Sequence, residues 1–88
     1  MQALKDKKKV LLQVLGNIIK KNRGKKSINQ LSYEIDLSKS VWSNVEKGRK
    51  DIQFTTLWRI IEALDINPAE FIKEVYSELD ETFSMIED

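Results

Sequence analysis

The stretch SKSVWSNVEKG, residues 38–48, decides the fold of this 88-residue chain, because it carries both the start and the stop signal of one short helix. Ser38 is a favourable N-cap, since its hydroxyl can accept a hydrogen bond from an amide left unpaired in the first turn. Gly48 ends the helix by supplying a left-handed residue without a Cβ penalty. Trp42 and Val45 stand three apart, so they can share a buried face.

The opposite face of this helix combines a cation, small hydroxyls, one amide and one branched apolar side chain. Its members are Lys39, Ser40, Val41, Ser43, Asn44 and Lys47. A helix face that only meets solvent is usually richer in Glu, Lys and Gln. The edges of bases in the major groove require donors, acceptors and a methyl contact together. On this stretch alone, an ordinary amphipathic helix and a base-reading helix are equally good interpretations.

Charge is distributed unevenly along the chain although the net charge is only +1. Residues 1–50 hold thirteen Lys or Arg against four Asp or Glu, which gives +9. Residues 51–88 hold two against ten, which gives −8. The basic half favours a polyanionic partner. The alternative is that the two halves attract each other within the fold.

Several classes of protein are disfavoured by composition. The chain has no Cys and no His, and its three glycines are too scattered for a phosphate-binding loop, so we expect no enzyme, metal site or cofactor. The apolar run 10–15 follows several lysines but is interrupted by Gln13 and lacks a cleavage site, so it is no signal peptide. No segment is long enough to cross a membrane, and the absence of Cys fits a reducing cytoplasm.

Apolar spacing and capping signals predict five helices, hence an all-α fold. The first should cover about 6–22, the second 27–36, and the fourth 54–64 with a core row at Phe54, Leu57, Ile60, Ile61 and Leu64. Asn67 and Pro68 start the fifth, and its pattern continues to Ile86 without a breaker. Ser27 and Gln30 form a capping box for the second helix, and Asp36 takes the left-handed position after it. Two short helices joined by about three residues form a helix-turn-helix unit.

The order of these elements resembles the Xre-like family of helix-turn-helix domains, to which the Cro protein and the phage repressors belong. The resemblance covers about residues 14–75 and rests on Leu31, Ile35, Leu37-Ser38, Val45-Glu46-Lys47-Gly48, Leu57, Ala63-Leu64, Ile66 and Glu70-Phe71. It implies a compact five-helix bundle with a helix-turn-helix and an extended C-terminal helix. Residues 1–75 would form the DNA-binding domain, and 76–88 an acidic helical extension that serves dimerisation.

The resemblance also assigns roles to single positions. The residues that match base-contacting positions are Lys39, Ser40, Val41 and Asn44. Ser43, Lys47, Arg49 and Lys50 lie where the family contacts DNA phosphates, and we expect further phosphate contacts from Lys25, Lys26 and Asn29. Trp42 and Val45 match buried positions, and Glu46 a structural one. Three positions depart from the family pattern: Ile28 replaces a phosphate-binding Gln, Asp36 replaces the Gly of the turn, and Ser32 replaces a small residue, commonly Ala.

The end of the chain carries a second pattern, in which apolar residues alternate at spacings of four and three. Its members are Ile72, Tyr76, Leu79, Phe83 and Ile86. This spacing is typical of a seam between two helices, and it favours a homodimer interface. The alternative is that the seam folds back on Leu4 and Leu11 of the first helix, with Lys5 and Lys8 facing the acidic tail.

The resulting hypothesis is a regulator of transcription, a repressor, that binds double-stranded DNA sequence-specifically as a homodimer. It would act in the cytoplasm, on the nucleoid, and be encoded by a bacterium or a phage. One alternative is an antitoxin that represses its own operon and binds a toxin as protein partner. The other is a protein-interaction module whose basic face meets an acidic protein and does not bind DNA.

Overall fold

The computed structural model describes residues 4–86 and contains five helices and no strand within that range. The helices are α1 (Leu4–Arg23), α2 (Ile28–Glu34), α3 (Lys39–Glu46), α4 (Phe54–Ala63) and α5 (Pro68–Glu78). The prediction of an all-α, five-helix bundle is therefore confirmed. No described helix is long and apolar enough to span a membrane.

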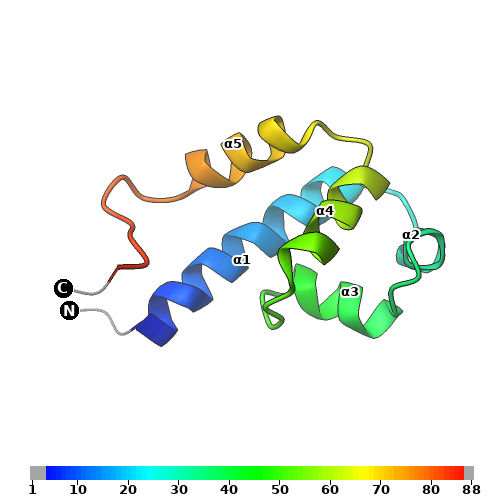
Figure 1. Ribbon diagram of the computed structural model, residues 1–88, viewed down its shortest axis with the longest axis horizontal. Helices are drawn as coiled ribbons and strands as arrows, with labels where there is room; N and C mark the ends of the chain where they lie inside the picture. The colour runs from blue at the N-terminus through cyan, green and yellow to red at the C-terminus, as the bar shows by residue number, and fades with distance from the viewer. Residues whose placement is uncertain (1–3, 87–88) are drawn as a thin grey trace.

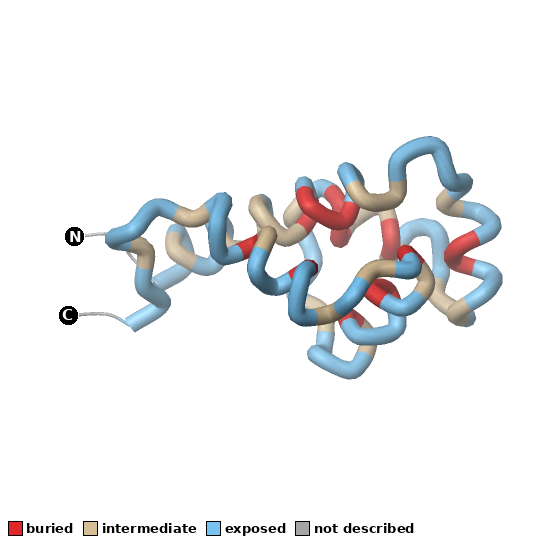
Figure 2. The backbone as a smooth tube through the Cα atoms, turned by 90° about the horizontal axis from the view of Figure 1, so that it is seen from above, coloured by how far each residue is buried: buried red, intermediate tan, exposed pale blue. Residues whose placement is uncertain are grey.

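The long helix α1 is the axis of the molecule, which measures 42 × 24 × 22 Å. Helices α3 and α5 both pack on α1, α2 packs on α3, and α4 packs on α5 (Figure 1). Buried positions gather where the C-terminal half of α1 meets α3, α4 and α5 (Figure 2). Residues 4–15 and 76–86 contain no fully buried position, so the end of the molecule that holds both termini is thinly packed.

Each of the three predicted N-caps is present. Ser38 Oγ accepts a hydrogen bond from the amide of Val41 (3.1 Å), and Ser27 Oγ accepts one from Gln30 (3.4 Å). Asn67 Oδ1 accepts from the first two free amides of α5, at 2.8 and 3.2 Å. The capping box at Ser27 is only half formed, because the Gln30 side chain donates to Glu34 Oε1 (3.4 Å) within α2.

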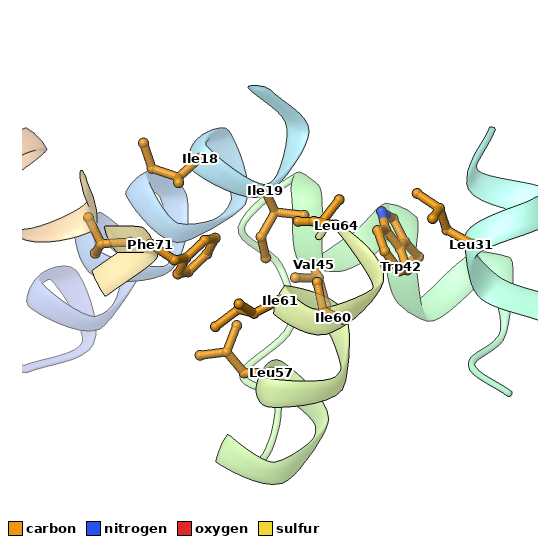
Figure 3. Packing of buried hydrophobic residues seen from close by; sticks show 11 residues of the cluster. Ile18, Ile19, Leu31, Trp42, Val45, Leu57, Ile60, Ile61, Leu64 and Phe71 are labelled. Atoms are coloured by element: carbon orange, nitrogen blue, oxygen red, sulfur yellow. The ribbon is translucent and has the colours of Figure 1, made fainter. Parts of the chain in front are cut away.

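The core is one apolar cluster formed by all five helices. Figure 3 shows Phe71 of α5 near Ile18 of α1. Trp42 of α3 lies at the other end of the cluster, near Leu31 of α2. The predicted burial of Trp42 and Val45 is confirmed, with 0% and 2% of their surfaces exposed. The core row predicted for α4 is wrong at its first member, since Phe54 is 64% exposed.

The prediction that the last helix continues to Ile86 is wrong. Helix α5 ends at Glu78, and Leu79 already has extended backbone angles (φ −88°, ψ 147°). Asp80 then closes a turn: its Oδ1 accepts from the Thr82 amide (2.8 Å) and hydroxyl (2.6 Å), which lowers the pKa of the carboxyl. A short acceptor side chain that bonds backbone two residues on competes with helical hydrogen bonding. Residues 79–86 therefore form no helical seam or helical extension.

Residues 79–86 instead return along α1. The alternative in which the end of the chain folds back on the first helix therefore holds in part, although the returning segment is not helical. Leu79 packs against the apolar core, and Lys7 Nζ donates to the carbonyl oxygen of Ile86 (2.6 Å). Lys8 does not face the tail as expected, since it pairs with Asp51 at 3.2 Å. Of the predicted interface members, Ile72, Tyr76 and Ile86 are exposed and Leu79 and Phe83 half-buried. Glu87 and Asp88 lie outside the described residues.

Candidate nucleic-acid interface

Helices α2 and α3 form the predicted helix-turn-helix, joined by residues 35–38. Asp36 takes the left-handed position with φ 53°, and its amide donates to Tyr33 O at 3.3 Å. The next amide, that of Leu37, donates to Ser32 O at 2.9 Å. Arg59 of α4 adds a hydrogen bond to Ile35 O (2.9 Å), which fastens the turn to the bundle. Asp in place of Gly at position 36 is therefore accommodated, as Asp tolerates this conformation better than most residues.

The inner face of α3 is held by a buried carboxylate. Glu46 is 8% exposed, and its Oε2 accepts from Trp42 Nε1 at 2.7 Å. The Arg23 guanidinium at the end of α1 donates Nε to Oε2 (2.6 Å) and Nη2 to Oε1 (3.0 Å). Hydrogen bonding to Glu46 raises the pKa of Arg23 above its usual value. The structural role expected for Glu46 is thus confirmed, and the carboxylate joins α1 to α3.

Arg23 also supports the basic turn that follows it, residues 24–26, which contains Lys25 and Lys26. Its Nη1 donates to the carbonyl oxygen of Lys26 at 3.0 Å, so the backbone of the turn is tied to the same guanidinium as Glu46. The sequence patterns gave Arg23 no role, so its contacts with Glu46 and Lys26 were missed. A buried glutamate such as Glu46 requires a cation or several donors, but sequence alone offers many nearby lysines and arginines as partners.

Two glycines set the distance between α1 and α3. A Cβ added at Gly16 would lie 2.5 Å from the carbonyl oxygens of both Val45 and Glu46, so α1 contacts the C-terminal end of α3 backbone to backbone. Gly48, with φ 72°, lies against the backbone of Gln13. The sequence predicted the left-handed role of Gly48 but not these close approaches.

The outer face of α3 carries the residues expected to meet bases. Lys39 and Ser40 are exposed, while Val41 and Asn44 are half-buried. Val41 also packs against the apolar core, so only part of its side chain is free to touch a thymine methyl. All four lie on one short helix whose ends are fixed by the Ser38 cap and by Gly48.

The residues expected at phosphates surround this face. Lys25, Lys26, Asn29, Lys47, Arg49 and Lys50 are exposed, and Ser43 is half-buried. None of these cations forms an ion pair within residues 4–86. The basic residues that do pair with carboxylates are Lys8, Lys21 and Arg23, all on α1. The ion pairs that join the basic half to the acidic half, Lys8–Asp51 and Lys21–Glu74, thus both use lysines of α1. The cations around α3 stay available to an external anion.

The start of α2 differs from the family pattern in the expected way. Ile28 is half-buried and packs against the core, so its side chain offers no phosphate contact. Asn29 beside it is exposed. Tyr33 on the same helix is 89% exposed and was not singled out by the sequence patterns.

Comparison with solved structures finds the same fold in the restriction-modification controller protein C.Esp1396I. Its wild-type form aligns with a TM-score of 0.70 and 24% identity, covering 77% of this chain and 90% of that chain. The C.Esp1396I tetramer in complex with its natural 35 base-pair operator gives the same TM-score and identity, with 92% of that chain covered. No curated protein matches the chain.

The family itself is identified by sequence. The model of the Cro/C1-type HTH DNA-binding domain matches residues 15–75, nearly the range that the sequence patterns suggested. This range contains α2, α3 and α4 entirely, together with the parts of α1 and α5 that pack on them. The chain therefore belongs to the family of Cro/C1-type helix-turn-helix DNA-binding domains.

Proposed function

We propose that this protein represses transcription by binding a specific double-stranded DNA operator with α3 as its recognition helix. The observation that carries the proposal is the arrangement around α3. The helix is fixed on its inner side by Glu46 and the close contact at Gly16, while its outer face is polar and surrounded by cations that form no ion pair within residues 4–86. A rigid helix with that chemistry suits the major groove, which is about 12 Å wide.

Three side chains on α3 offer different base contacts. Asn44 can form two hydrogen bonds with adenine, and Lys39 can reach the acceptors of guanine. Val41 can touch a thymine methyl with the part of its side chain that the core leaves free. Base reading would therefore depend mainly on Lys39 and Asn44, with Ser40 able to serve as donor or acceptor.

Phosphate binding would come from the cations on either side of α3. Lys25 and Lys26 follow α1, and Lys47, Arg49 and Lys50 follow α3, so they form two groups at the ends of the helix-turn-helix. Asn29 and Ser43 lie on α2 and α3 and add neutral donors. These contacts would supply affinity and position without reading sequence.

Repression would result from binding of the protein to its operator. The solved complex of the structural relative C.Esp1396I with its natural operator supports binding of this kind. The site of action would be the bacterial nucleoid, where double-stranded DNA is available, with the gene carried by the bacterium or by a phage.

Selection from a random duplex library tests the proposal directly. The wild-type protein should enrich one defined sequence, and Asn44→Ala should lose or change that preference while staying folded. Lys73→Ala serves as the control, because Lys73 is an exposed cation of α5 in the acidic half of the chain. Absence of duplex binding even at low salt would reject the proposal in favour of a protein-interaction module. Binding without any enriched sequence would reject specific regulation.

A further inference from the structure

One side of α1 faces α3 at its C-terminal half and carries lysines at its N-terminal half. The residues of this side are spaced by four, three, four and seven positions, as expected for one stripe of a helix: Lys5, Lys9, Leu12, Gly16 and Arg23. Gly16 touches the backbone at the end of α3, and Arg23 bonds the Glu46 carboxylate. The stripe is therefore the side of α1 that is turned toward α3.

The N-terminal half of α1 extends beyond α3. Gly16 lies against Val45 and Glu46, which are the last two residues of α3. The loop that follows α3 covers the next part of α1, since Gly48 lies against the backbone of Gln13. Figure 1 shows α1 continuing past this loop toward its N-terminal end. Part of the α3-facing side of α1 thus has neither α3 nor the loop in front of it.

Lys5 and Lys9 occupy this uncovered part of the stripe. Both are exposed, and neither forms an ion pair within residues 4–86. The two lysines between them in the sequence do have partners: Lys7 donates to the carbonyl oxygen of Ile86 (2.6 Å), and Lys8 pairs with Asp51 (3.2 Å). The family model begins to match only at residue 15, so both lysines also lie outside the matched range.

We propose that Lys5 and Lys9 bind phosphates of the DNA that flanks the bases read by α3. This inference rests on the proposed function and extends it to a longer stretch of DNA. In the proposed complex α3 lies between α1 and the DNA, because its inner face packs on α1 and its outer face reads bases. Where α3 ends, the same side of α1 faces the DNA directly.

The depth of the major groove brings phosphates to the level of α1. Packed helices have axes about 8–10 Å apart, and the backbone contact at Gly16 puts α1 and α3 at the short end of that range. The major groove is about 8.5 Å deep. With α3 in the groove, the sugar-phosphate backbones beside it rise about as far as α1. A lysine there needs only its flexible four-carbon stem to place the ammonium at a phosphate.

The spacing of the two lysines fits a DNA strand. Lys9 and Lys5 precede Gly16 by seven and eleven residues, which places them about 10 and 16 Å farther along the helix axis. They are about 6 Å apart along that axis, since each residue adds 1.5 Å. One strand of DNA has a phosphate every ~3.4 Å of its axis. The pair therefore suits phosphates one or two positions apart, beyond the end of α3.

Salt titrations on two duplexes provide the test. The long duplex holds the selected operator with about one helical turn, ~10 base pairs, added at each end, and the short duplex ends at the enriched bases. On the long duplex, Lys5→Ala with Lys9→Ala should reduce the slope of log K against log salt by about two units per bound chain, ~0.9 for each phosphate contact. On the short duplex, this variant and wild type should have the same slope.

Two further double variants separate phosphate binding from other causes. Lys7→Ala with Lys73→Ala is the matched control: it removes the same charge, but Lys7 lies on the side of α1 that bonds Ile86, and Lys73 is on α5. It should leave both slopes unaltered. Lys5→Arg with Lys9→Arg keeps the charge and should keep the wild-type slope on the long duplex. A reduced slope in the matched control would mean that net charge is responsible, which contradicts the inference.

Hydroxyl-radical footprinting of wild type on the long duplex gives a measurement that needs no substitution. Protection should extend past the enriched bases into the flanking DNA, and Lys5→Ala with Lys9→Ala should shorten it to those bases. A wild-type footprint that ends at the enriched bases overturns the inference. Equal slopes for wild type and the alanine variant on the long duplex do the same, and so does an equal loss of slope on both duplexes.

The outcomes also separate this inference from the proposed function. Specific operator binding without any contribution from the flanks rejects the role of Lys5 and Lys9 and leaves the regulator intact. A reduced slope on the long duplex with an unchanged base preference supports both. Absence of duplex binding by wild type rejects the regulator and, with it, the flanking contacts that depend on it.

Discussion

The guanidinium of Arg23 and the carboxylate of Glu46 form a two-pronged ion pair, with N–O distances of 2.6 and 3.0 Å, across 23 positions of the chain. The pair is largely enclosed, since 17% of the Arg23 and 7% of the Glu46 side chain is exposed. Trp42 donates to the same carboxylate. The orientation of α3 thus depends on one buried acidic group, which links α3 to α1 and, through the hydrogen bond from Arg23 to Lys26 O, to the turn at residues 24–26.

Replacing Glu46 with Ala should lower the free energy of unfolding by about 3–5 kcal/mol, because it leaves the largely enclosed guanidinium of Arg23 and the buried indole N–H of Trp42 without their acceptor. Urea denaturation provides the measurement. Glu62→Ala, at an exposed carboxylate of α4, is the control and should stay within ~0.5 kcal/mol of wild type. Equal effects of the two substitutions would contradict the role given to the ion pair.

Gly16→Ala should destabilise the protein even though Ala favours helices by about 1 kcal/mol over Gly. The new Cβ would lie 2.5 Å from two carbonyl oxygens of α3, which are backbone atoms and cannot rotate away. Overpacking of this kind costs about 1–3 kcal/mol, and it should also reduce operator affinity by displacing α3. Asn17→Ala, at the exposed neighbouring position, is the control and should reduce neither the stability nor the operator affinity. A more stable Gly16→Ala protein would show that the helices separate easily.

Asn44→Ala should weaken binding to the selected operator by about 1–3 kcal/mol while affinity for random duplex stays nearly unchanged. The reason is that Asn44 would pair with a base, and only the specific complex contains that base. Fluorescence anisotropy with both duplexes gives the comparison. If both affinities fall equally, Asn44 contacts the DNA backbone or acts through stability.

Neutralising a cation that touches phosphate should reduce the slope of log K against log salt by about one unit, whatever the DNA sequence. The substitutions are Lys25→Ala, Lys26→Ala, Arg49→Ala and Lys50→Ala. Lys73→Ala is the control and should leave the slope unaltered. An unchanged slope for all four substitutions would remove these residues from the DNA interface.

The contact between α1 and α5 should make stability depend on acid pH. Lys21 Nζ donates to Glu74 Oε2 (2.6 Å) and Asn22 Nδ2 to Oε1 (3.2 Å), which together lower the pKa of Glu74 below its ordinary value. A lowered carboxyl pKa gives stability that is present above the unfolded value and is lost as the pH falls through the folded value. Glu74→Gln should therefore melt below wild type at neutral pH.

The melting temperatures of the two proteins should converge once the pH has fallen through the lowered pKa of Glu74, where Glu74 is protonated in the folded state as well. Glu62→Gln is the comparison variant, since Glu62 is exposed and forms no ion pair within the described residues. A constant difference between Glu74→Gln and wild type at all pH values would mean that packing, and not charge, stabilises this contact.

The sequence by itself determined the helix starts and the helix that we propose as the recognition helix. Ser38, Gly48 and Asn67 act on backbone groups within three residues of themselves, so their effects can be predicted from neighbours in the chain. The three-residue spacing of Trp42 and Val45 likewise placed both in the core. The four residues that the family resemblance assigns to base contacts lie in the same short stretch, and the structure places all four on one helix.

Only the tertiary structure decided which partners these elements meet. Periodicity shows that residues share a face, but not whether another helix covers it, and Phe54 therefore lies exposed where a core position was predicted. The pairing of Arg23 with Glu46 and the contact at Gly16 depend on how α1 crosses α3. The end of α5 followed from competition, since apolar spacing to Ile86 favoured a helix while the Asp80 turn and the packing of Leu79 favoured return along α1. Each of these outcomes depends on the free energy of contacts between distant parts of the chain, and a local sequence pattern carries no information about such contacts.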